Sequence, residues 1–283
     1  MPYTAEISRS HPAYFIFLVD QSGSMSDPQG GNPSKSKAES VSDAINRIVQ
    51  NLVIQCSKNE GVFDYFCVSV IGYGKAVESG FRGALAGRPF ASTSELEANP
   101  ARLETRMQRI PDGAGGLVDV PVKLSVWFDP VASGPTPMCQ ALDAAYQLAA
   151  GWLQRNPAGY PPIVMNLTDG EATDGDPRIG AARLTSLASS DGNLLLFNVH
   201  ISTQQGHTAL FPANDYALVD DFAKSLFAMS SPLPDSMLKH ASTMELPVQP
   251  GSRGFIFNAD IVSVIQFLEI GTRPSNMSAL ALR

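Results

Sequence analysis

The chain has 283 residues, of which 44% are apolar, and its formal net charge is −7 at pH 7. This apolar content can bury a sizeable core, which excludes a disordered chain. The acidic balance excludes a general nucleic-acid binder, because no excess of cationic side chains is available to contact a phosphate backbone.

The start of the chain and its cysteines predict a cytoplasmic protein. The first six residues carry no basic segment followed by an apolar run, so we expect no secretory signal peptide. No apolar stretch approaches the ~20 residues of a membrane-spanning helix, so we expect no membrane partner. Cys56, Cys67 and Cys139 are far apart and lack the C-x-x-C spacing of a zinc or redox site, which predicts reduced thiols.

Apolar runs of strand length alternate with helical patterns from residue 14 onward. Apolar residues at i, i+3, i+4 and i+7 indicate the helices, and strands that are apolar throughout are typical of a parallel sheet buried on both faces. In chain order we expect a strand at 14–19, a helix at 35–56, a strand at 66–71, a helix at 138–155, a strand at 163–167, a helix at 176–188, a strand at 194–201, a helix at 215–229, a strand at 254–257 and a helix at 260–270.

This alternation predicts the fold class. Strands joined by right-handed helical crossovers form an α/β, doubly wound, mostly parallel central sheet with helices on both faces, and we expect one edge strand to be antiparallel. A single domain should cover 14–271, with an N-terminal extension at 1–13 and a C-terminal tail at 272–283. Such sheets bind ligands at the carboxyl ends of their strands, so functional residues should lie there.

Two stretches interrupt the alternation. Residues 72–134 are rich in Gly, Pro and charged side chains, and a structureless loop of that length is rare in a compact domain. We therefore predict an edge strand or hairpin with an elaborated surface loop, including a short helix at 103–110 and a strand at 122–128. Residues 231–251 are irregular, with a short helix near 236–240.

Polar side chains follow the first strand directly. Asp20, Ser22 and Ser24 stand at alternate positions of the segment DQSGS, and Gly23 allows a turn that points their oxygens inward. Two later loops carry Thr136, in GPTP, and Asp169, in TDG. Each segment alone is an ordinary turn. Together they supply oxygen ligands for a hard cation such as Mg²⁺ or Mn²⁺.

In their order and spacing, these three segments resemble the metal-ion-dependent adhesion site (MIDAS) of von Willebrand factor A domains. The resemblance covers the chain from about 14 to 270 and implies a doubly wound fold of that type. It also implies that Asp20, Ser22, Ser24, Thr136 and Asp169 bind a divalent ion, Mg²⁺ first, with Mn²⁺ or Ca²⁺ as alternatives. In the family the hydroxyls bind the ion directly, the carboxylates act partly through water, and one position is left for an acidic residue of a partner.

Neighbouring polar residues have simpler interpretations. An accessory cation site at Asp174 and Asp176 is one interpretation, but Asp176 before Pro177 is typical of a helix cap, and Asp174 is expected to solvate its loop. His200 lies on the predicted strand at 194–201, where a hydrogen-bonded core or rim histidine is expected rather than a ligand.

An enzyme is the main alternative. Asp20 at a strand end beside Mg²⁺ is similar to the nucleophile of phosphoryl-transfer enzymes, but haloacid-dehalogenase-like phosphatases need a second acid at the position of Ser22. The segment QSGS lacks the first glycine of a serine-hydrolase elbow, and GYGK lacks the spacing of a phosphate loop. A purely structural domain without an ion is the second alternative. We expect no catalytic residues.

The partner is therefore expected to be a protein. The metal would capture a Glu or Asp side chain, and the stretch 72–134, which ends just before Thr136, would supply specificity. The chain also resembles stand-alone bacterial A domains of tellurite-resistance or stress systems, which implies an adaptor or scaffold in a stress or defence complex, with a kinase, a phosphatase or an AAA+ ATPase as partner or regulated enzyme.

Overall fold

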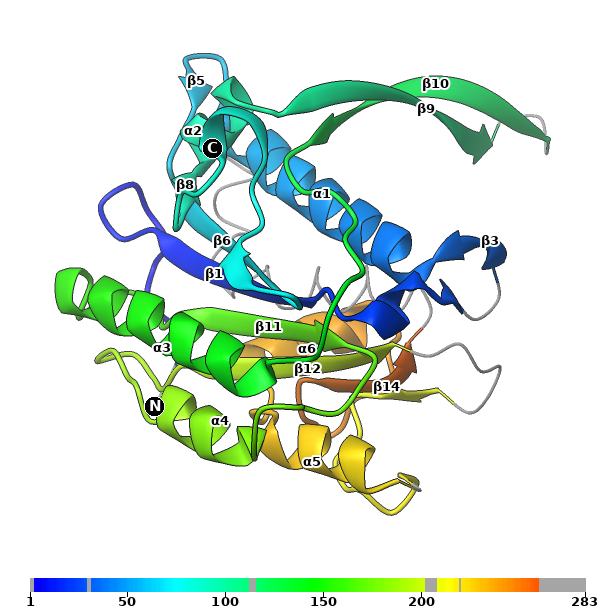
Figure 1. Cartoon of the computed structure of the whole chain (residues 1–283). Helices are drawn as coiled ribbons and strands as arrows, with labels where there is room; N and C mark the ends of the chain where they lie inside the picture. Colours follow the sequence, from blue (N-terminus) through cyan, green and yellow to red (C-terminus); the bar gives the residue numbers. More distant parts are fainter. Residues whose placement is uncertain (1–2, 30–31, 112–115, 202–207, 219, 260–283) are drawn as a thin grey trace.

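The computed structural model describes residues 3–29, 32–111, 116–201, 208–218 and 220–259. Within these ranges, eight strands form one sheet in the order β13-β14-β12-β11-β1-β6-β7, with β8 also paired to β6 (Figure 1). The helix predicted at 260–270 and the tail at 272–283 lie outside the described residues. The predicted fold class is confirmed.

The middle of the sheet is parallel and its edges are antiparallel. The parallel strands are β1 (Ala13–Asp20), β6 (Phe66–Tyr73), β11 (Ile163–Thr168), β12 (Leu195–Ile201) and β14 (Phe255–Ala259). The antiparallel strands are β7 (Val77–Ser79), β8 (Ala91–Ser92) and β13 (Ala209–Leu210). Short hairpins are formed by β2 (Pro28–Gln29) with β3 (Asn32–Ser36) and by β4 (Ser57–Lys58) with β5 (Gly61–Val62).

Helices cover both faces of the sheet. One face carries α1 (Lys37–Cys56) and α6 (Asp235–Thr243), and the other carries α3 (Met138–Arg155), α4 (Pro177–Thr185) and α5 (Asp221–Met229). A further short helix, α2 (Thr93–Ala98), packs against α1, and η1 (Gly23–Ser26) and η2 (Gly83–Leu85) are 3₁₀ turns. Local chemistry sets the helix starts: Ser36 and Glu39 form a reciprocal capping box for α1, and Asp176 caps α4.

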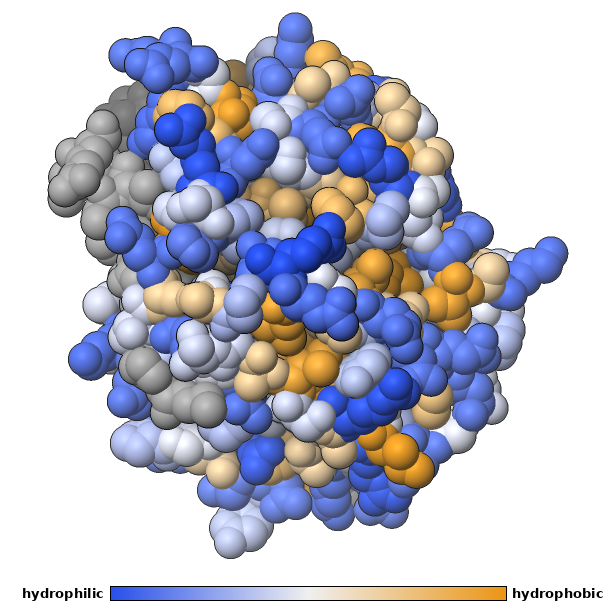
Figure 2. Space-filling view, turned by 90° about the vertical axis from the view of Figure 1, so that its left-hand side faces the viewer, coloured by the Kyte–Doolittle hydropathy of each residue, from blue (hydrophilic) through white to orange (hydrophobic). Residues whose placement is uncertain are grey.

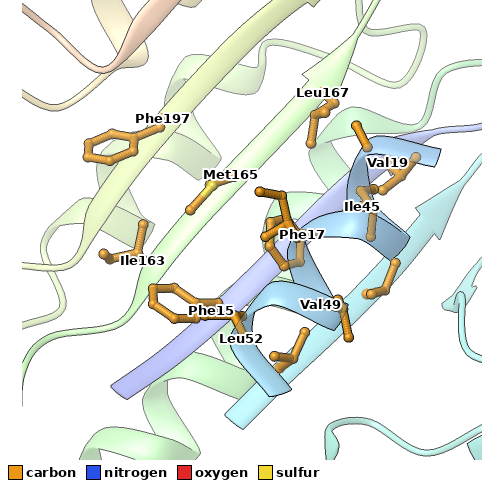
Figure 3. Packing of buried hydrophobic residues seen from close by; sticks show 14 of the residues in the cluster. Phe15, Phe17, Val19, Ile45, Val49, Leu52, Ile163, Met165, Leu167 and Phe197 are labelled. Carbon is orange, nitrogen blue, oxygen red and sulfur yellow. The ribbon is translucent and has the colours of Figure 1, made fainter. Parts of the chain in front are cut away.

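Alternate residues of β1 divide the core into two layers. Phe15, Phe17 and Val19 pack against Ile45, Val49 and Leu52 of α1, together with residues of β11 and β12 (Figure 3). Tyr14, Ile16 and Leu18 point to the other face, toward α3 and its neighbours. Because burial of each large apolar side chain contributes about 1.5–3 kcal/mol, this two-sided burial holds the carboxyl end of β1 at a fixed place.

The prediction of a helix at 103–110 is wrong. Residues Arg102–Pro111 form strand β9, which pairs in antiparallel register with β10 (Leu117–Val126). This hairpin is a two-stranded sheet apart from the main sheet, and it extends beyond α1 (Figure 1). Its base is fixed to α1, because the Gln50 side chain donates to the Lys123 carbonyl and accepts from the Ser125 amide. The prediction of a hairpin within 72–134 is thereby confirmed.

Apolar and polar side chains are mixed on the face that lies at one end of the sheet. Figure 2 views the end at which the parallel strands begin, and apolar residues there are interspersed with polar ones. Such scattered exposure is normal on folded proteins. Among the described helices, none is long and apolar enough to cross a membrane. The short helix predicted near 236–240 is confirmed as α6.

Candidate functional site

The candidate site lies where the winding of the sheet reverses. β1 has β6 on one side and β11 on the other, and the chain proceeds from β1 first to β6 and later to β11, β12 and β14. The connection after β1 leads to α1 on one face and the connection after β11 leads to α4 on the other, and in such sheets the ligand-binding crevice lies between the carboxyl ends of these two strands. Asp20 ends β1, and Asp169 directly follows β11.

Asp20 is buried at the base of this crevice. Its Oδ1 accepts the Ser22 amide at 2.8 Å, and its Oδ2 accepts the Thr168 hydroxyl at 2.7 Å. Burial is the largest influence on this carboxyl and raises its pKa from 3.8 to about 6, although the hydrogen bonds from Thr168 and Ser22 oppose that rise. The charge of Asp169 adds to the rise, so a nearby cation would favour the ionised form of Asp20.

Two serine hydroxyls and the second carboxylate meet above Asp20. Ser22 Oγ lies 3.0 Å from Ser24 Oγ, and Ser24 Oγ donates to Asp169 Oδ1 at 2.8 Å. These three side chains come from the turn after β1 and the turn after β11. Four of the five predicted site residues are thus joined, Asp20 through the Ser22 backbone and the others through their side chains.

Thr136 lies at the edge of the same crevice, in the turn before α3. Its backbone exchanges two hydrogen bonds with Thr173, at 3.1 and 3.0 Å. A Cβ built on Gly170 would lie 3.9 Å from Thr136 Oγ1, so the hydroxyl faces the turn that also carries Asp169. The Gly23 amide donates to the Gly134 carbonyl at 3.0 Å, which ties this turn to the first one.

Lys37 also reaches the site, which the sequence did not indicate. Its Nζ lies 2.6 Å from Asp169 Oδ2, 3.4 Å from the Ser24 carbonyl oxygen and 3.7 Å from Asp27 Oδ2. The Lys37 side chain is 6% exposed and that of Asp169 is 1% exposed. The sequence gives no signal for this ion pair, because nothing distinguishes a lysine at the polar start of a helix as the partner of a distant aspartate.

The donor chemistry of the five residues fits a hard divalent cation. Hydroxyl and carboxylate oxygens are the ligands that Mg²⁺ prefers. The Ser24 hydroxyl lies within hydrogen-bonding distance of both the Ser22 hydroxyl and the Asp169 carboxylate. Across the described residues, no group of three or more His, Cys, Asp or Glu side chains could hold a metal ion. A cation at this crevice would thus depend on hydroxyl ligands, as Ser22, Ser24 and Thr136 provide.

Comparison with known proteins gives similar solved structures only. No protein-family model and no curated protein matches the chain. The structure is similar to a von Willebrand factor type A structure from Catenulispora acidiphila, with 14% identity, a TM-score of 0.49, and coverage of 94% of this chain and 43% of that one. It is also similar to proximal thread matrix protein 1 from the mussel byssus, with 16% identity, a TM-score of 0.39 and coverage of 70% and 39%.

A third similar structure is the ArnB paralog VWA2 from Sulfolobus acidocaldarius, with 12% identity, a TM-score of 0.33 and coverage of 67% and 35%. This chain spans less than half the length of each of these three solved chains. Structural similarity at this level assigns no role to any residue. The description of the site rests on the contacts given above.

Asp174 has a different role from the predicted one. Its carboxylate accepts the amides of Cys139 and Gln140, each at 3.0 Å, so it caps α3 from a separate loop. Pro137 at the N-cap position of α3 has no side-chain acceptor, which leaves these amides to Asp174. The predicted cap of α4 by Asp176 is confirmed, because its Oδ1 accepts the Arg178 amide at 3.0 Å.

Replacing Asp174 with alanine should lower the free energy of unfolding by about 1–2 kcal/mol, the usual cost of losing a helix cap. Urea denaturation measures this loss. Asp143→Ala is the matched control, because Asp143 lies on the same helix and only pairs with Arg183 at the surface, where such pairs contribute little. Equal losses in the two variants would contradict a capping role for Asp174.

His200 lies on β12, opposite Thr168 of β11, as a half-buried rim residue. Its ring stacks on Phe257 with a centroid distance of 4.9 Å, and Nδ1 accepts the Asn258 amide at 3.4 Å. Burial lowers the pKa of His200, which favours the neutral ring. The prediction of a hydrogen-bonded rim histidine is confirmed. All three cysteines are free, with Cys56 and Cys67 buried and Cys139 partly exposed.

Proposed function

We propose that this chain is a non-enzymatic protein-binding module that holds a divalent cation and uses it to capture an acidic side chain of a partner. The direct contact of Ser22, Ser24 and Asp169 at the reversal point of the sheet carries this proposal. Asp20 and Thr136 complete the oxygen set of an intact MIDAS. Mg²⁺ is the first choice of ion, and Mn²⁺ and Ca²⁺ are alternatives.

The chemistry of the crevice supports binding. Because few carboxylates would surround a bound Mg²⁺, most of its positive charge would remain unneutralised. This charge would attract a Glu or Asp carboxylate of the partner. Ser22, Ser24 and Thr136 would hold the ion, and Asp20 and Asp169 would orient those hydroxyls and balance the charge. Both carboxylate oxygens of Asp20 are already occupied, by the Ser22 amide and the Thr168 hydroxyl, which disfavours attack on a phosphate.

The partner is proposed to be a cytoplasmic protein of a bacterial stress or defence system, such as a kinase, a phosphatase or an AAA+ ATPase. The hairpin of β9 and β10 would add specificity, because it exposes Leu103 and Met107 to 60% and 64% on a rigid ladder. A tellurite-resistance role rests on the resemblance to stand-alone bacterial A domains described above, which is an analogy rather than chemistry.

Magnesium titration of the whole chain tests the metal site. We expect saturable binding by calorimetry and thermal stabilisation, equivalent to about 2.7 kcal/mol when free Mg²⁺ is 100 times its Kd. Ser24→Ala should weaken binding at least about tenfold, because it removes a ligand that contacts Ser22 and Asp169. Ser26→Ala is the matched control in the same turn, since its hydroxyl donates only to the Gly23 carbonyl.

Two further measurements separate binding from catalysis. Affinity purification from the source cells, with mass spectrometry, should recover a partner with Mg²⁺ and lose it with a chelator or with Asp20→Ala plus Ser22→Ala. If the partner is recovered equally well with the chelator and with the double variant, metal-dependent binding is contradicted. Steady hydrolysis of a phosphoester such as p-nitrophenyl phosphate, lost in Asp20→Asn, would instead favour a metal-dependent phosphohydrolase.

A further inference from the structure

Asp169 is shared between two partners of different kinds. Its Oδ1 accepts the Ser24 hydroxyl, and its Oδ2 carries the Lys37 ammonium at 2.6 Å. The same ammonium lies 3.4 Å from the Ser24 carbonyl oxygen. A positive charge of the chain itself is thus placed among the oxygens that would hold the divalent cation.

This placement is enforced by the fold. Lys37 is the first residue of α1, where a cation opposes the helix dipole, and burial of an ammonium is costly unless it is paired. Its backbone is nevertheless held in place on both sides. The Lys37 amide donates to the Asp27 carbonyl at 3.0 Å, and the preceding residue, Ser36, forms the capping box with Glu39. The long side chain is directed inward and is 6% exposed.

We propose that the Lys37 ammonium is a built-in competitor of the divalent cation at Asp169. Resting on the proposed function, this inference concerns how readily the site is loaded. Without the divalent ion, the ammonium balances the charge of Asp169 and keeps the turn after β1 joined to the turn after β11. A divalent ion held by the hydroxyls beside Asp169 is repelled by the ammonium, so loading requires Lys37 to leave Asp169 Oδ2.

This competition lowers the affinity for the ion below that of the oxygen ligands alone. The Lys37 ammonium has a second effect once the ion displaces it, because it stays attached to α1 beside the crevice. There it adds to the attraction for an incoming carboxylate. The site would then be loaded with an ion mainly when free ion is abundant or an acidic partner is present.

Calorimetric titration with Mn²⁺, and with Mg²⁺, of the full chain tests the competition. Lys37→Met removes the charge while keeping most of the side-chain volume, and should bind the ion at least about tenfold more tightly than the unmodified chain. Lys37→Arg keeps the charge and should stay close to the unmodified chain. Lys58→Met is the control for net charge, because Lys58 follows the far end of the 20-residue helix α1.

The outcomes separate this inference from the proposed function. If the unmodified chain binds the ion and Lys37→Met binds it no better, the competition is refuted and the metal site stands. If neither protein binds, both ideas fail. Binding by Lys37→Met alone would support the competition in its strongest form, with the ammonium in the place of the ion.

A second measurement uses the unmodified chain alone, so poor folding of a variant cannot affect it. In the unmodified chain, the reactivity of Lys37 toward an amine-acetylating reagent is followed by mass spectrometry as Mg²⁺ is added. Because the side chain is 6% exposed, acetylation should be slow without the ion and should rise with site occupancy. Labelling of Lys58 should not change. A Lys37 rate that is independent of bound Mg²⁺ would overturn the proposal.

Discussion

Gly74→Ala is expected to destabilise the protein by about 3 kcal/mol or more, because the added methyl group would clash with backbone atoms of two turns. A Cβ at Gly74 would lie 2.6 Å from the Gln21 carbonyl oxygen and 2.7 Å from the Ser133 carbonyl oxygen. Both are backbone atoms and cannot rotate away. To make room, the turn after β1 and the turn before α3 would have to separate.

Those two turns are joined through the same carbonyls. The Ser133 amide donates to the Gln21 oxygen at 2.6 Å, and the Lys75 amide donates to the Ser133 oxygen at 2.9 Å. Moving either carbonyl breaks a backbone hydrogen bond, and moving the Gln21 carbonyl also displaces Ser22, the next residue of the first turn. We therefore expect ion binding by Gly74→Ala to weaken together with stability.

Gly151→Ala is the matched control for this methyl group. Gly151 lies inside α3, and apart from the nearby backbone of this helix no atom lies within 4 Å of a Cβ built there. Alanine is favoured over glycine in a helix by about 0.5–1 kcal/mol, so this variant should be unchanged or more stable. Denaturant midpoints of both variants give the comparison, and similar stabilities for the two would contradict the close packing of the turns.

The positions of Asp20 and Asp169 were predictable because a parallel sheet brings distant strand ends together. β1 is apolar up to Asp20, and β11 is apolar except for Asn166 and Thr168, which marks both as central strands, and neighbouring parallel strands end at the same edge. The polar residues at their carboxyl ends must therefore meet. The polarity pattern of the strands is enough to place these two residues, and no side-chain contact has to be known.

The contacts of Lys37 and Asp174 depend on where loops place long or distant side chains, and no periodic pattern encodes that. The error at β9 has another cause. Leu103 and Met107 are four residues apart, which places them on one face of a helix and also on one face of a strand. Their exposure in the hairpin shows that burial did not decide between the two. Pairing with β10 decided it, and the partner strand begins outside the segment in question.

Asn198→Leu is expected to cost about 2–4 kcal/mol, because it interrupts a buried chain of hydrogen bonds beneath the site. Tyr73 reaches across β1 and donates to Asn166 Oδ1 at 2.7 Å. Asn166 Nδ2 donates to Asn198 Oδ1 at 3.0 Å, and Asn198 Nδ2 lies 3.0 Å from Ser230 Oγ. Leucine has a similar volume and can replace none of these bonds.

The two asparagines should behave as a coupled pair. Each single leucine variant leaves the other amide buried without its partner, whereas replacing both partners removes the mismatch between them. In a double-mutant cycle with urea, the loss for Asn166→Leu with Asn198→Leu should be smaller than the sum of the single losses by at least about 1 kcal/mol. The exposed Asn214, changed to leucine, is the control and should stay within about 0.5 kcal/mol of the unmodified chain.

The same variants test whether this chain of hydrogen bonds supports the site. Tyr73 accepts the Gln21 amide through its carbonyl at 2.7 Å, and Asn166 lies two residues before Thr168, whose hydroxyl holds Asp20. If the chain positions both turns, Mg²⁺ binding should weaken in each single variant at temperatures where the variant stays folded. Additive stability losses with unchanged Mg²⁺ affinity would show instead that the asparagines act separately and only in the core.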